Sequence, residues 1–201
     1  TYRSYLYKAL VAAGKQVDFV GVNRGTCGNA NAGTQGGWDG DHCSFYSAKA
    51  SEILAGNMPV NSCSPAGSGN IQAWAPALKP DLAIIHLGTN DCRGGASPAQ
   101  IQGSLAGIIG HLRSANPKVK IIVAQIIENR DASANARVKA FNATVPTWAA
   151  GLSTAASPVV VVDQASGWNT QTHLRDTFHP NAAGAQRMSS RFLGAVQGLY
   201  P

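Results

Sequence analysis

The stretch Asp81-Leu82-Ala83-Ile84-Ile85-His86-Leu87, followed directly by Gly88-Thr89-Asn90-Asp91, decides the fold. Its apolar residues do not alternate with polar ones, so both faces of the predicted strand must be covered by other elements. Further strands are predicted at 17–22, 119–127 and 159–162, and helices at 3–13, 47–55, 98–115, 136–149 and 181–199. This alternation indicates an α/β protein, a three-layer α/β/α sandwich around a central parallel sheet with right-handed crossovers.

The composition is that of a single folded domain spanning residues 1–201. Charged residues make up 13% of the chain, against roughly 25% in an average soluble protein, which favours a secreted, extracellular protein. No stretch approaches the roughly 18 apolar residues of a membrane span, so no membrane association is expected. The net charge of +6 comes from scattered basic residues, whereas nucleic-acid recognition needs a cluster. We therefore expect no nucleic-acid partner, and, as a separate expectation, a monomer.

The four cysteines contain no Cys-x-x-Cys pair, which argues against zinc sites and thioredoxin-type redox sites. Two disulfides in an oxidising compartment fit the low charge, and four cysteines allow three pairings. We predict Cys27–Cys43 and Cys63–Cys92, because the second would tie a long loop to the end of a central strand. The glycosylation sequon Asn-Ala-Thr at 142–144 is compatible with secretion, although such sequons also arise by chance.

Asn90 is the first candidate for a chemical role, because it directly follows the predicted strand 81–87. Active sites of parallel sheets lie beyond the carboxyl ends of the strands. The side-chain amide of Asn90 can donate a hydrogen bond to an anion that forms during a reaction. Alternatively, Gly88-Thr89-Asn90-Asp91 is only a turn, since Gly, Asn and Asp are common turn residues.

The second candidate is the segment Asp176-Thr177-Phe178-His179, just before the last predicted helix. A catalytic histidine needs a carboxylate that fixes its tautomer and stabilises its imidazolium form. Asp176 and His179 are three residues apart in a loop that turns into a helix, so both can point to one spot. A lone histidine is more often structural, but its pairing with Asp176 and its position favour a catalytic role.

Together, the segments 88–91 and 176–179 resemble the Asn-bearing and Asp-x-x-His blocks of the SGNH, or GDSL-type, hydrolases. The resemblance runs from about Tyr2 to the C-terminus and implies the flavodoxin-like SGNH hydrolase fold. The segments 18–21, 39–42, 157–164 and 183–184 are similar to carbohydrate esterase family 3, which contains secreted acetyl xylan esterases. The resemblance therefore implies a secreted serine esterase without a cofactor or metal, acting on acetylated polysaccharide such as xylan or on a small ester.

The same resemblance implies the roles of the site residues. A serine attacks the ester carbonyl, His179 takes its proton, Asp176 orients His179, and Asn90 donates to the oxyanion. The family's second block supplies a glycine whose backbone N–H also binds the oxyanion. By spacing to Glu52–Gly56 the matching position here is Ser47, and Gly37 is an out-of-register alternative.

The chain departs from the family at the nucleophile, because no Gly-Asp-Ser triplet occurs in it. In the family this serine ends a central first strand that precedes the first helix, and here the chain opens directly in a helix. We expect this strand and its serine to lie upstream of Thr1. The alternatives are a substitute serine, with Ser4, Ser44 and Ser47 as candidates by position, or an inactive enzyme.

Three other readings remain open. A catalytically silent carbohydrate-binding relative on the same fold would explain the missing serine, and a GDSL esterase with a different ester substrate would share the site. A flavodoxin-like cofactor binder needs a phosphate-cradling loop, and none is evident. Asp39, Asp41 and His42 are potential cation ligands, but they lack a full ligand set, so a polar loop is favoured.

Overall fold

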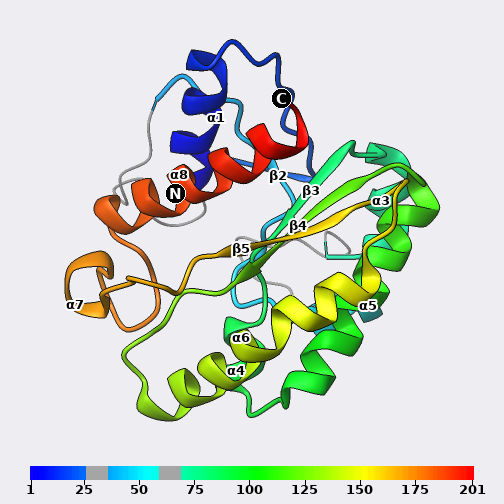
Figure 1. Ribbon diagram of the computed structural model, residues 1–201. Helices are drawn as coiled ribbons and strands as arrows, with labels where there is room; N and C mark the ends of the chain where they lie inside the picture. The colour runs from blue at the N-terminus through cyan, green and yellow to red at the C-terminus, as the bar shows by residue number, and fades with distance from the viewer. Residues whose placement is uncertain (26–35, 59–68) are drawn as a thin grey trace.

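The computed structural model describes residues 1–25, 36–58 and 69–201 (Figure 1). The helices are α1 (Tyr2–Ala12), α2 (Ala50–Ala55), α3 (Ile71–Leu78), α4 (Thr89–Arg93), α5 (Pro98–Ala115), α6 (Ala132–Leu152), α7 (Thr170–His173) and α8 (Ala182–Leu199). The strands are β1 (Asn23–Arg24), β2 (Asp41–His42), β3 (Leu82–Ile85), β4 (Lys120–Gln125) and β5 (Val159–Asp163). Among these residues no helix is long and apolar enough to cross a membrane.

The central sheet is parallel, with the order β3-β4-β5. Leu82 lies opposite Lys120 in the first pair, and Ile121 opposite Val159 in the second. The middle strand β4 is covered on both faces, so that Ile121–Ala124 are at most 1% exposed. This is the burial that uninterrupted apolar strands predict, and the predicted parallel sheet is confirmed.

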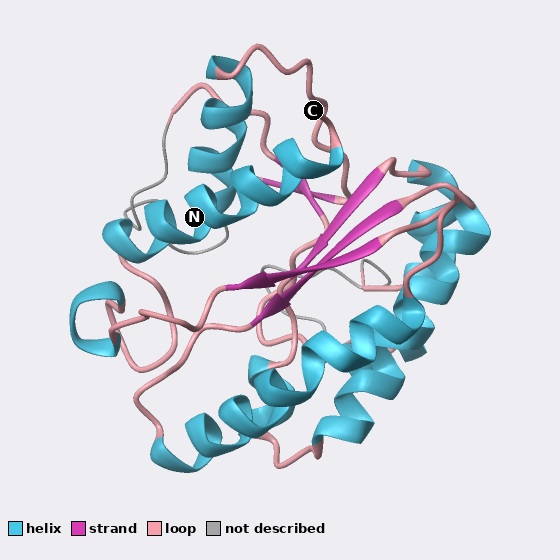
Figure 2. Cartoon of the chain, viewed as in Figure 1, coloured by secondary structure: helices cyan, strands magenta, loops and turns pink. Residues whose placement is uncertain are grey.

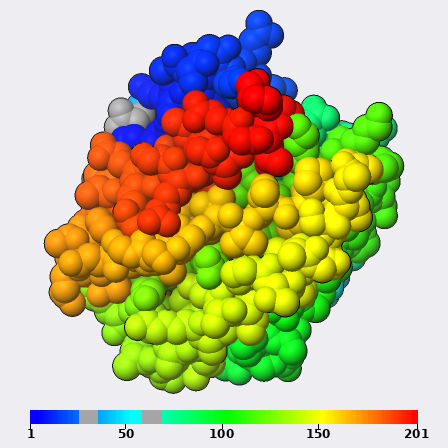
Figure 3. Space-filling view, viewed as in Figure 1, coloured from blue at the N-terminus to red at the C-terminus, as the bar shows by residue number. Residues whose placement is uncertain are grey.

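Helices cover both faces of the sheet, as Figure 2 shows with the strands in magenta between cyan helices. On one face α1 and α8 pack together, and their blue and red surfaces adjoin in Figure 3. On the other face lie α3, α5 and α6. Each layer has its own apolar core, centred on Phe192 under α1 and α8 and on Phe141 under α5 and α6. The expected three-layer α/β/α sandwich is therefore confirmed.

The long helices begin at residues that cap them. Ser97 and Gln100 form a capping box before α5, and Pro98 occupies its first position, so the predicted helix 98–115 is confirmed. The carboxylate of Asp131 accepts from the Ala134 N–H, which starts α6 four residues earlier than predicted. The side chain of Asn181 caps α8 in the same way.

The helix α6 also continues through Pro146, which was expected to lie near its end. Proline has no N–H, so the carbonyl of Asn142 loses its helical partner. The Gln125 side chain donates to this carbonyl at 2.9 Å instead. Asn142 is itself 6% exposed, and its side chain exchanges two hydrogen bonds with the backbone of Ile126. The sequon asparagine is therefore buried and unavailable for glycosylation in the folded protein.

The prediction of a strand at 17–22 was wrong. This segment is extended but pairs with no strand in the described part of the chain, and a cavity of about 810 Å³ separates residues 16–20 from β3. Instead, β1 and β2 form a small antiparallel pair that sequence analysis missed. Two residues per strand are too few to show a periodic pattern. The short helices α3 and α7 were also missed.

The predicted disulfides fall partly outside the described residues, which do not include Cys27 or Cys63. The other two cysteines, Cys43 and Cys92, are free thiols, and none of the described residues forms a disulfide. Burial raises the pKa of each of these thiols to about 11, so both are protonated and unreactive at neutral pH.

Candidate active site

The predicted site residues lie where β3, β4 and β5 end, because parallel strands bring their carboxyl ends to one edge of the sheet. Asn90 belongs to α4, which follows β3, and His179 lies between α7 and α8, after β5. A cation–π contact joins these two segments, because the guanidinium of Arg93 in α4 lies 5.2 Å from the ring centre of Phe178. The loop that follows β4 also contacts the second segment, where the backbone N–H of Arg130 donates to the Thr177 carbonyl at 2.9 Å.

Asp176 and His179 form a close pair. The Nδ1 atom of His179 lies 2.9 Å from Oδ2 and 3.0 Å from Oδ1 of Asp176. The backbone N–H groups of Phe178 and His179 also donate to Oδ1, both at 2.8 Å. Partial burial acts to raise the pKa of Asp176, but these hydrogen bonds outweigh it and hold the pKa below its usual value. Asp176 is therefore ionised at neutral pH and faces Nδ1, leaving Nε2 as the basic atom.

Backbone hydrogen bonds fix the loop that carries this pair. The N–H of Arg175 donates to the His179 carbonyl at 2.9 Å, and Leu174 forms an isolated antiparallel bridge with Pro180. About half of the His179 side chain remains exposed to solvent. The loop thus presents an oriented imidazole at an open surface, where a bulky substrate has access.

Asn90 is presented by a sharp turn out of β3. Gly88, which precedes α4, has a φ of 129°, a backbone conformation that side chains rarely permit. The amide Nδ2 of Asn90 donates to the Ala48 carbonyl at 3.1 Å. Because a side-chain amide carries two N–H donors, this bond fixes the side chain and leaves the second hydrogen for another acceptor. The segment 88–91 is thus the start of a helix rather than a simple turn.

Asp91 is a positioning residue that sequence analysis did not assign. Asp91 is 3% exposed, and its two carboxylate oxygens accept from the Ala50 N–H at 3.0 and 3.1 Å. Burial raises its pKa, although the backbone hydrogen bonds act in the opposite direction. This contact joins α4 to the start of α2 and so holds Asn90 beside 47–50. Its position directly after Asn90 could have indicated this role, because consecutive residues of a helix lie on different faces. Asp91 can therefore hold the helix in place while Asn90 points in another direction.

Ser47 lies next to the Ala48 carbonyl that Asn90 contacts, so the structure brings these two predicted residues together. Its φ of 58° is in the left-handed region, which glycine adopts without strain and serine does not. Gly37 also has a positive φ, but it lies in the bend 36–38, and no described contact ties it to α4. The geometry therefore favours Ser47 over Gly37 as the position equivalent to a glycine.

We expect Ser47→Gly to raise the free energy of unfolding by about 0.5–1 kcal/mol, because it removes left-handed strain. The backbone N–H at this position is retained, so a role that uses only this group is unaffected. Urea denaturation measures the gain, and Ser47→Ala, which keeps the strain, is the matched control. Destabilisation by Ser47→Gly would show that the serine hydroxyl supports the fold.

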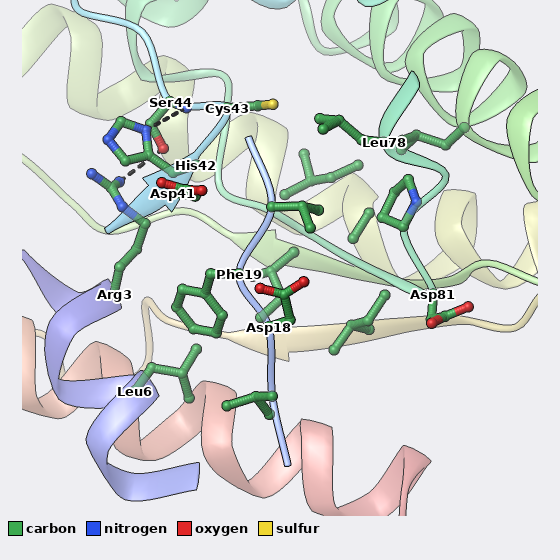
Figure 4. Close-up of a pocket in the computed structure, with 18 of the residues that line it drawn as sticks. Arg3, Leu6, Asp18, Phe19, Asp41, His42, Cys43, Ser44, Leu78 and Asp81 are labelled. Carbon is green, nitrogen blue, oxygen red and sulfur yellow. Dashed lines mark hydrogen bonds between the residues drawn. The ribbon is translucent and has the colours of Figure 1, made fainter. Parts of the chain in front are cut away.

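The substitute serines have other contacts. Ser4 is fully buried in α1, and its hydroxyl donates to the Thr1 carbonyl at 2.9 Å. The hydroxyl of Ser44 accepts from the Arg3 guanidinium at 2.8 Å, and the Ser44 N–H donates to Nδ1 of His42. Ser44 therefore belongs to a polar cluster at one end of the cavity beside β3, as Figure 4 shows.

The polar loop at 39–42 is tied to its surroundings. The Asp39 carboxylate accepts from the Phe19 N–H at 2.8 Å and from the Asp41 N–H at 3.2 Å. Asp41 forms an ion pair with Arg24 at 2.7 Å. Burial, followed by the Arg3 cation, lowers the pKa of His42 to about 4. Among the described residues, no group of three or more His, Cys, Asp or Glu is arranged to hold a metal ion.

Comparison with known proteins identifies the family of the chain. The sequence pattern of the GDSL-like lipase/acylhydrolase family matches residues 1–187. A carbohydrate esterase family 3 protein from Talaromyces cellulolyticus is 30% identical, with a TM-score of 0.84 over 98% of this chain and 90% of that chain. A serine-to-alanine mutant of an acetyl esterase, crystallised with acetate ion, is also 30% identical, with the same coverage and a TM-score of 0.83.

A family 3 carbohydrate esterase from Clostridium thermocellum shares the fold at 21% identity, with a TM-score of 0.74 over 100% of this chain and 89% of that one. No curated protein matches the chain. The family pattern spans most of the chain and the structural matches span nearly all of it. The chain therefore belongs to the GDSL-like lipase/acylhydrolase family, with the carbohydrate esterase family 3 fold, and its activity is that of a carboxylic ester hydrolase.

Proposed function

We propose that the protein is a secreted serine esterase that removes acetyl groups from plant polysaccharide, with acetylated xylan as its predicted substrate. The observation that carries the proposal is the Asp176–His179 pair, held 2.9 Å apart at the edge of the sheet where Asn90 also lies. Neither a cofactor nor a metal is required. The family 3 relatives support the substrate class, and the open position of His179 suits acetyl groups carried on a polymer.

The reaction follows from the geometry. Nε2 of His179 takes the proton of a serine hydroxyl as its oxygen attacks the ester carbonyl. The tetrahedral oxyanion accepts hydrogen bonds from Nδ2 of Asn90 and the backbone N–H of Ser47. The imidazolium, stabilised by Asp176, then protonates the leaving sugar hydroxyl. Water, activated by the same histidine, hydrolyses the acetyl-serine to acetate and restores the enzyme.

We place the attacking serine on a segment that precedes Thr1. The two relatives at 30% identity cover 98% of this chain, but this chain covers only 90% of theirs. In one of them the mutated serine lies close to the start of that protein's numbering. Below, "the extended protein" means residues 1–201 together with the residues that precede Thr1.

The proposal is tested by acetate release from acetylated xylan and by labelling with a fluorophosphonate probe. We expect the extended protein to release acetate and to be labelled on one serine upstream of Thr1, while residues 1–201 alone stay unlabelled. Hydrolysis of p-nitrophenyl acetate without acetate release from xylan would indicate a different ester. Absence of both labelling and hydrolysis would favour a silent carbohydrate-binding relative, and labelling of Ser44 or Ser47 would identify a substitute nucleophile.

Asn90→Ala is expected to lower kcat of the extended protein by about 10²–10³-fold with little change in KM, because only the transition state carries the oxyanion. Initial rates with p-nitrophenyl acetate provide the measurement. Asn90→Asp should be at least as harmful, since its carboxylate repels the oxyanion. A change in KM alone would place Asn90 in substrate binding instead.

A further inference from the structure

The helix α7 (Thr170–His173), which precedes the catalytic loop, is too short to satisfy its own backbone. The His173 N–H closes its turn by donating to the Asn169 carbonyl at 2.9 Å. Because the last four carbonyls of a helix have no partner inside it, every carbonyl of this four-residue helix needs a donor from elsewhere. Figure 1 shows α7 beyond the carboxyl end of β5, so these donors decide how α7 and the loop after it lie relative to the sheet.

The guanidinium of Arg130 donates to three carbonyls of this segment. Its Nε atom donates to the Thr170 carbonyl at 2.9 Å. Its Nη2 atom donates to the carbonyl of Leu174, which ends α7, at 3.0 Å, and makes a longer bond of 3.4 Å to that of Gln171. Hydrogen bonds from a charged donor are about twice as strong as those between neutral groups. Arg130 lies between β4 and α6, so these bonds tie α7 to the end of the central strand.

Asn181, at the start of α8, satisfies the two carbonyls that remain. Its side-chain amide donates to the Thr172 carbonyl at 2.8 Å, and its backbone N–H donates to the His173 carbonyl at 2.9 Å. Each carbonyl from 170 to 174 thus has a donor, from Arg130 or from Asn181. Asn181 follows the catalytic loop directly in the chain, whereas Arg130 reaches it from a distant segment, so Arg130 sets the position of the loop relative to the sheet.

Arg130 also contacts the catalytic loop on both sides of Asp176. Leu174, whose carbonyl accepts from the guanidinium, precedes Asp176 and forms the bridge with Pro180 that closes the loop. The carbonyl of Thr177, which follows Asp176, accepts from the backbone N–H of Arg130 at 2.9 Å. One residue therefore fixes the backbone before and after the carboxylate.

We propose that Arg130 is a positioning residue for the reaction: its guanidinium fixes α7 and the loop 174–180 against the carboxyl end of β4, and thereby holds the His179 imidazole in its reactive orientation. About half of the His179 side chain is exposed, so packing orients it little and the backbone of the loop decides where it lies. A misplacement of about 1 Å can cost about 100-fold in rate. The inference rests on the proposed function only for the chemistry of His179.

A lysine cannot replace this arginine. The guanidinium presents five N–H donors in a rigid plane, so it can reach several carbonyls at once, whereas the ammonium of lysine is a single nitrogen on a flexible stem. Arg130→Lys therefore keeps the charge but not the geometry. If the charge alone were needed, this variant would be as active as the unaltered protein.

We expect Arg130→Ala to lower kcat of the extended protein for p-nitrophenyl acetate by about 10–100-fold and to leave KM within about twofold. Arg130→Lys should recover only part of the loss. Arg130 is exposed, so its removal leaves no cavity in the core, and thermal unfolding checks that the fold survives. An unchanged kcat in Arg130→Ala, or a rise in KM alone, would overturn the inference.

Arg113 on α5 provides the matched control. Its Nη2 atom donates to the carbonyls of Leu152 at 2.7 Å and Ser157 at 2.8 Å, just before β5 begins. This is the same kind of contact at the opposite edge of the sheet. Arg113 is less exposed than Arg130, so Arg113→Ala should lower the melting temperature at least as much, yet leave kcat within about twofold. Equal losses of kcat in the two variants would mean that Arg130 only stabilises the fold.

The ¹⁵N chemical shifts of the His179 ring separate this inference from the proposed function, because they require no hydrolysis. In the neutral ring we expect the proton on Nδ1, which faces Asp176, and in Arg130→Ala a change toward a mixture of both tautomers. If the extended protein hydrolyses no ester but shows this change in Arg130→Ala and not in Arg113→Ala, the positioning role is supported and the proposed function is overturned. Unchanged ring signals in Arg130→Ala would overturn the positioning role, whatever the activity.

Discussion

Replacing His179 with alanine is expected to reduce kcat/KM of the extended protein by about 10⁴–10⁶-fold, the largest effect of any single substitution in this chain. The imidazole supplies both proton transfers, first as the base for the serine and then as the acid for the leaving sugar hydroxyl. Among the described residues, the other basic side chain paired with Asp176 is that of Arg175 at 3.5 Å, and a guanidinium has no proton-accepting atom that could replace the imidazole. Initial rates of p-nitrophenyl acetate hydrolysis, or fixed-time assays where these rates are too slow, measure the loss of kcat/KM.

The matched control is His111→Ala on α5, which removes the same side chain outside the proposed site and should leave kcat/KM within about twofold. The half-exposed position of the His179 side chain indicates that its removal leaves the fold intact, and thermal unfolding checks this. Undiminished hydrolysis in His179→Ala would remove the proposed base and, with it, the Ser-His-Asp mechanism.

The parts of the fold that sequence predicted are those with dense local signals. The apolar segments predicted at 119–127 and 159–162 coincide with the central strand β4 and with all but the last residue of its neighbour β5, because burial on both faces requires an uninterrupted apolar run such as Ile121–Ala124. The helix 98–115 was predicted with its observed bounds, since Ser97, Pro98 and the following Asn116-Pro117 mark both ends. Such signals depend on adjacent residues, so they can be seen without knowing the tertiary structure.

The parts that sequence missed depend on contacts between distant residues. The segment 17–22 has the apolar pattern of a strand, but no described strand pairs with it, and pattern alone cannot show whether a partner is present. The helix α6 passes through Pro146 because Gln125, on a different element, donates to the Asn142 carbonyl. A local rule that ends helices near proline cannot include that donor.

The candidate site likewise has features that the local sequence predicts and features that it does not. The Asp-x-x-His spacing predicted a pair, and Nδ1 of His179 does lie beside the Asp176 carboxylate. The positive φ of Ser47 and the contact of Asp91 with Ala50 could not be predicted from the local sequence, because both depend on how α2 and α4 pack against each other. Whether Ser47 and Asn90 act on an oxyanion stays a prediction that the rates described above test.

Asp176→Asn is expected to lower kcat of the extended protein by about 10⁴-fold while leaving the loop folded. Asparagine keeps an oxygen that accepts from the N–H groups of Phe178 and His179, so the turn survives. Its amide, however, donates toward Nδ1 of His179, which moves the imidazole proton to Nε2. The histidine is then held in the tautomer that cannot accept the serine proton.

Asp163 provides the matched control for this substitution. Its Oδ1 accepts from the N–H groups of Ala165 and Ser166, both at 2.8 Å, the same arrangement as at Asp176 but without a histidine. Asp163→Asn should therefore leave kcat within about twofold, because it alters the same kind of turn at a place where no catalytic base is attached. Equal losses in both variants would mean that Asp176 supports only the loop.

Substituting Asp176 and His179 together shows whether the two residues act as one unit or contribute independently to the rate. If Asp176 acts only through His179, the variant carrying both Asp176→Asn and His179→Ala should be no slower than His179→Ala alone, because an absent imidazole cannot be held in a wrong tautomer. Independent contributions would instead multiply, adding the roughly 10⁴-fold loss to that of the histidine. Multiplied losses would show that the Asp176 carboxylate acts on the substrate directly, and the role of a positioning residue would have to be abandoned.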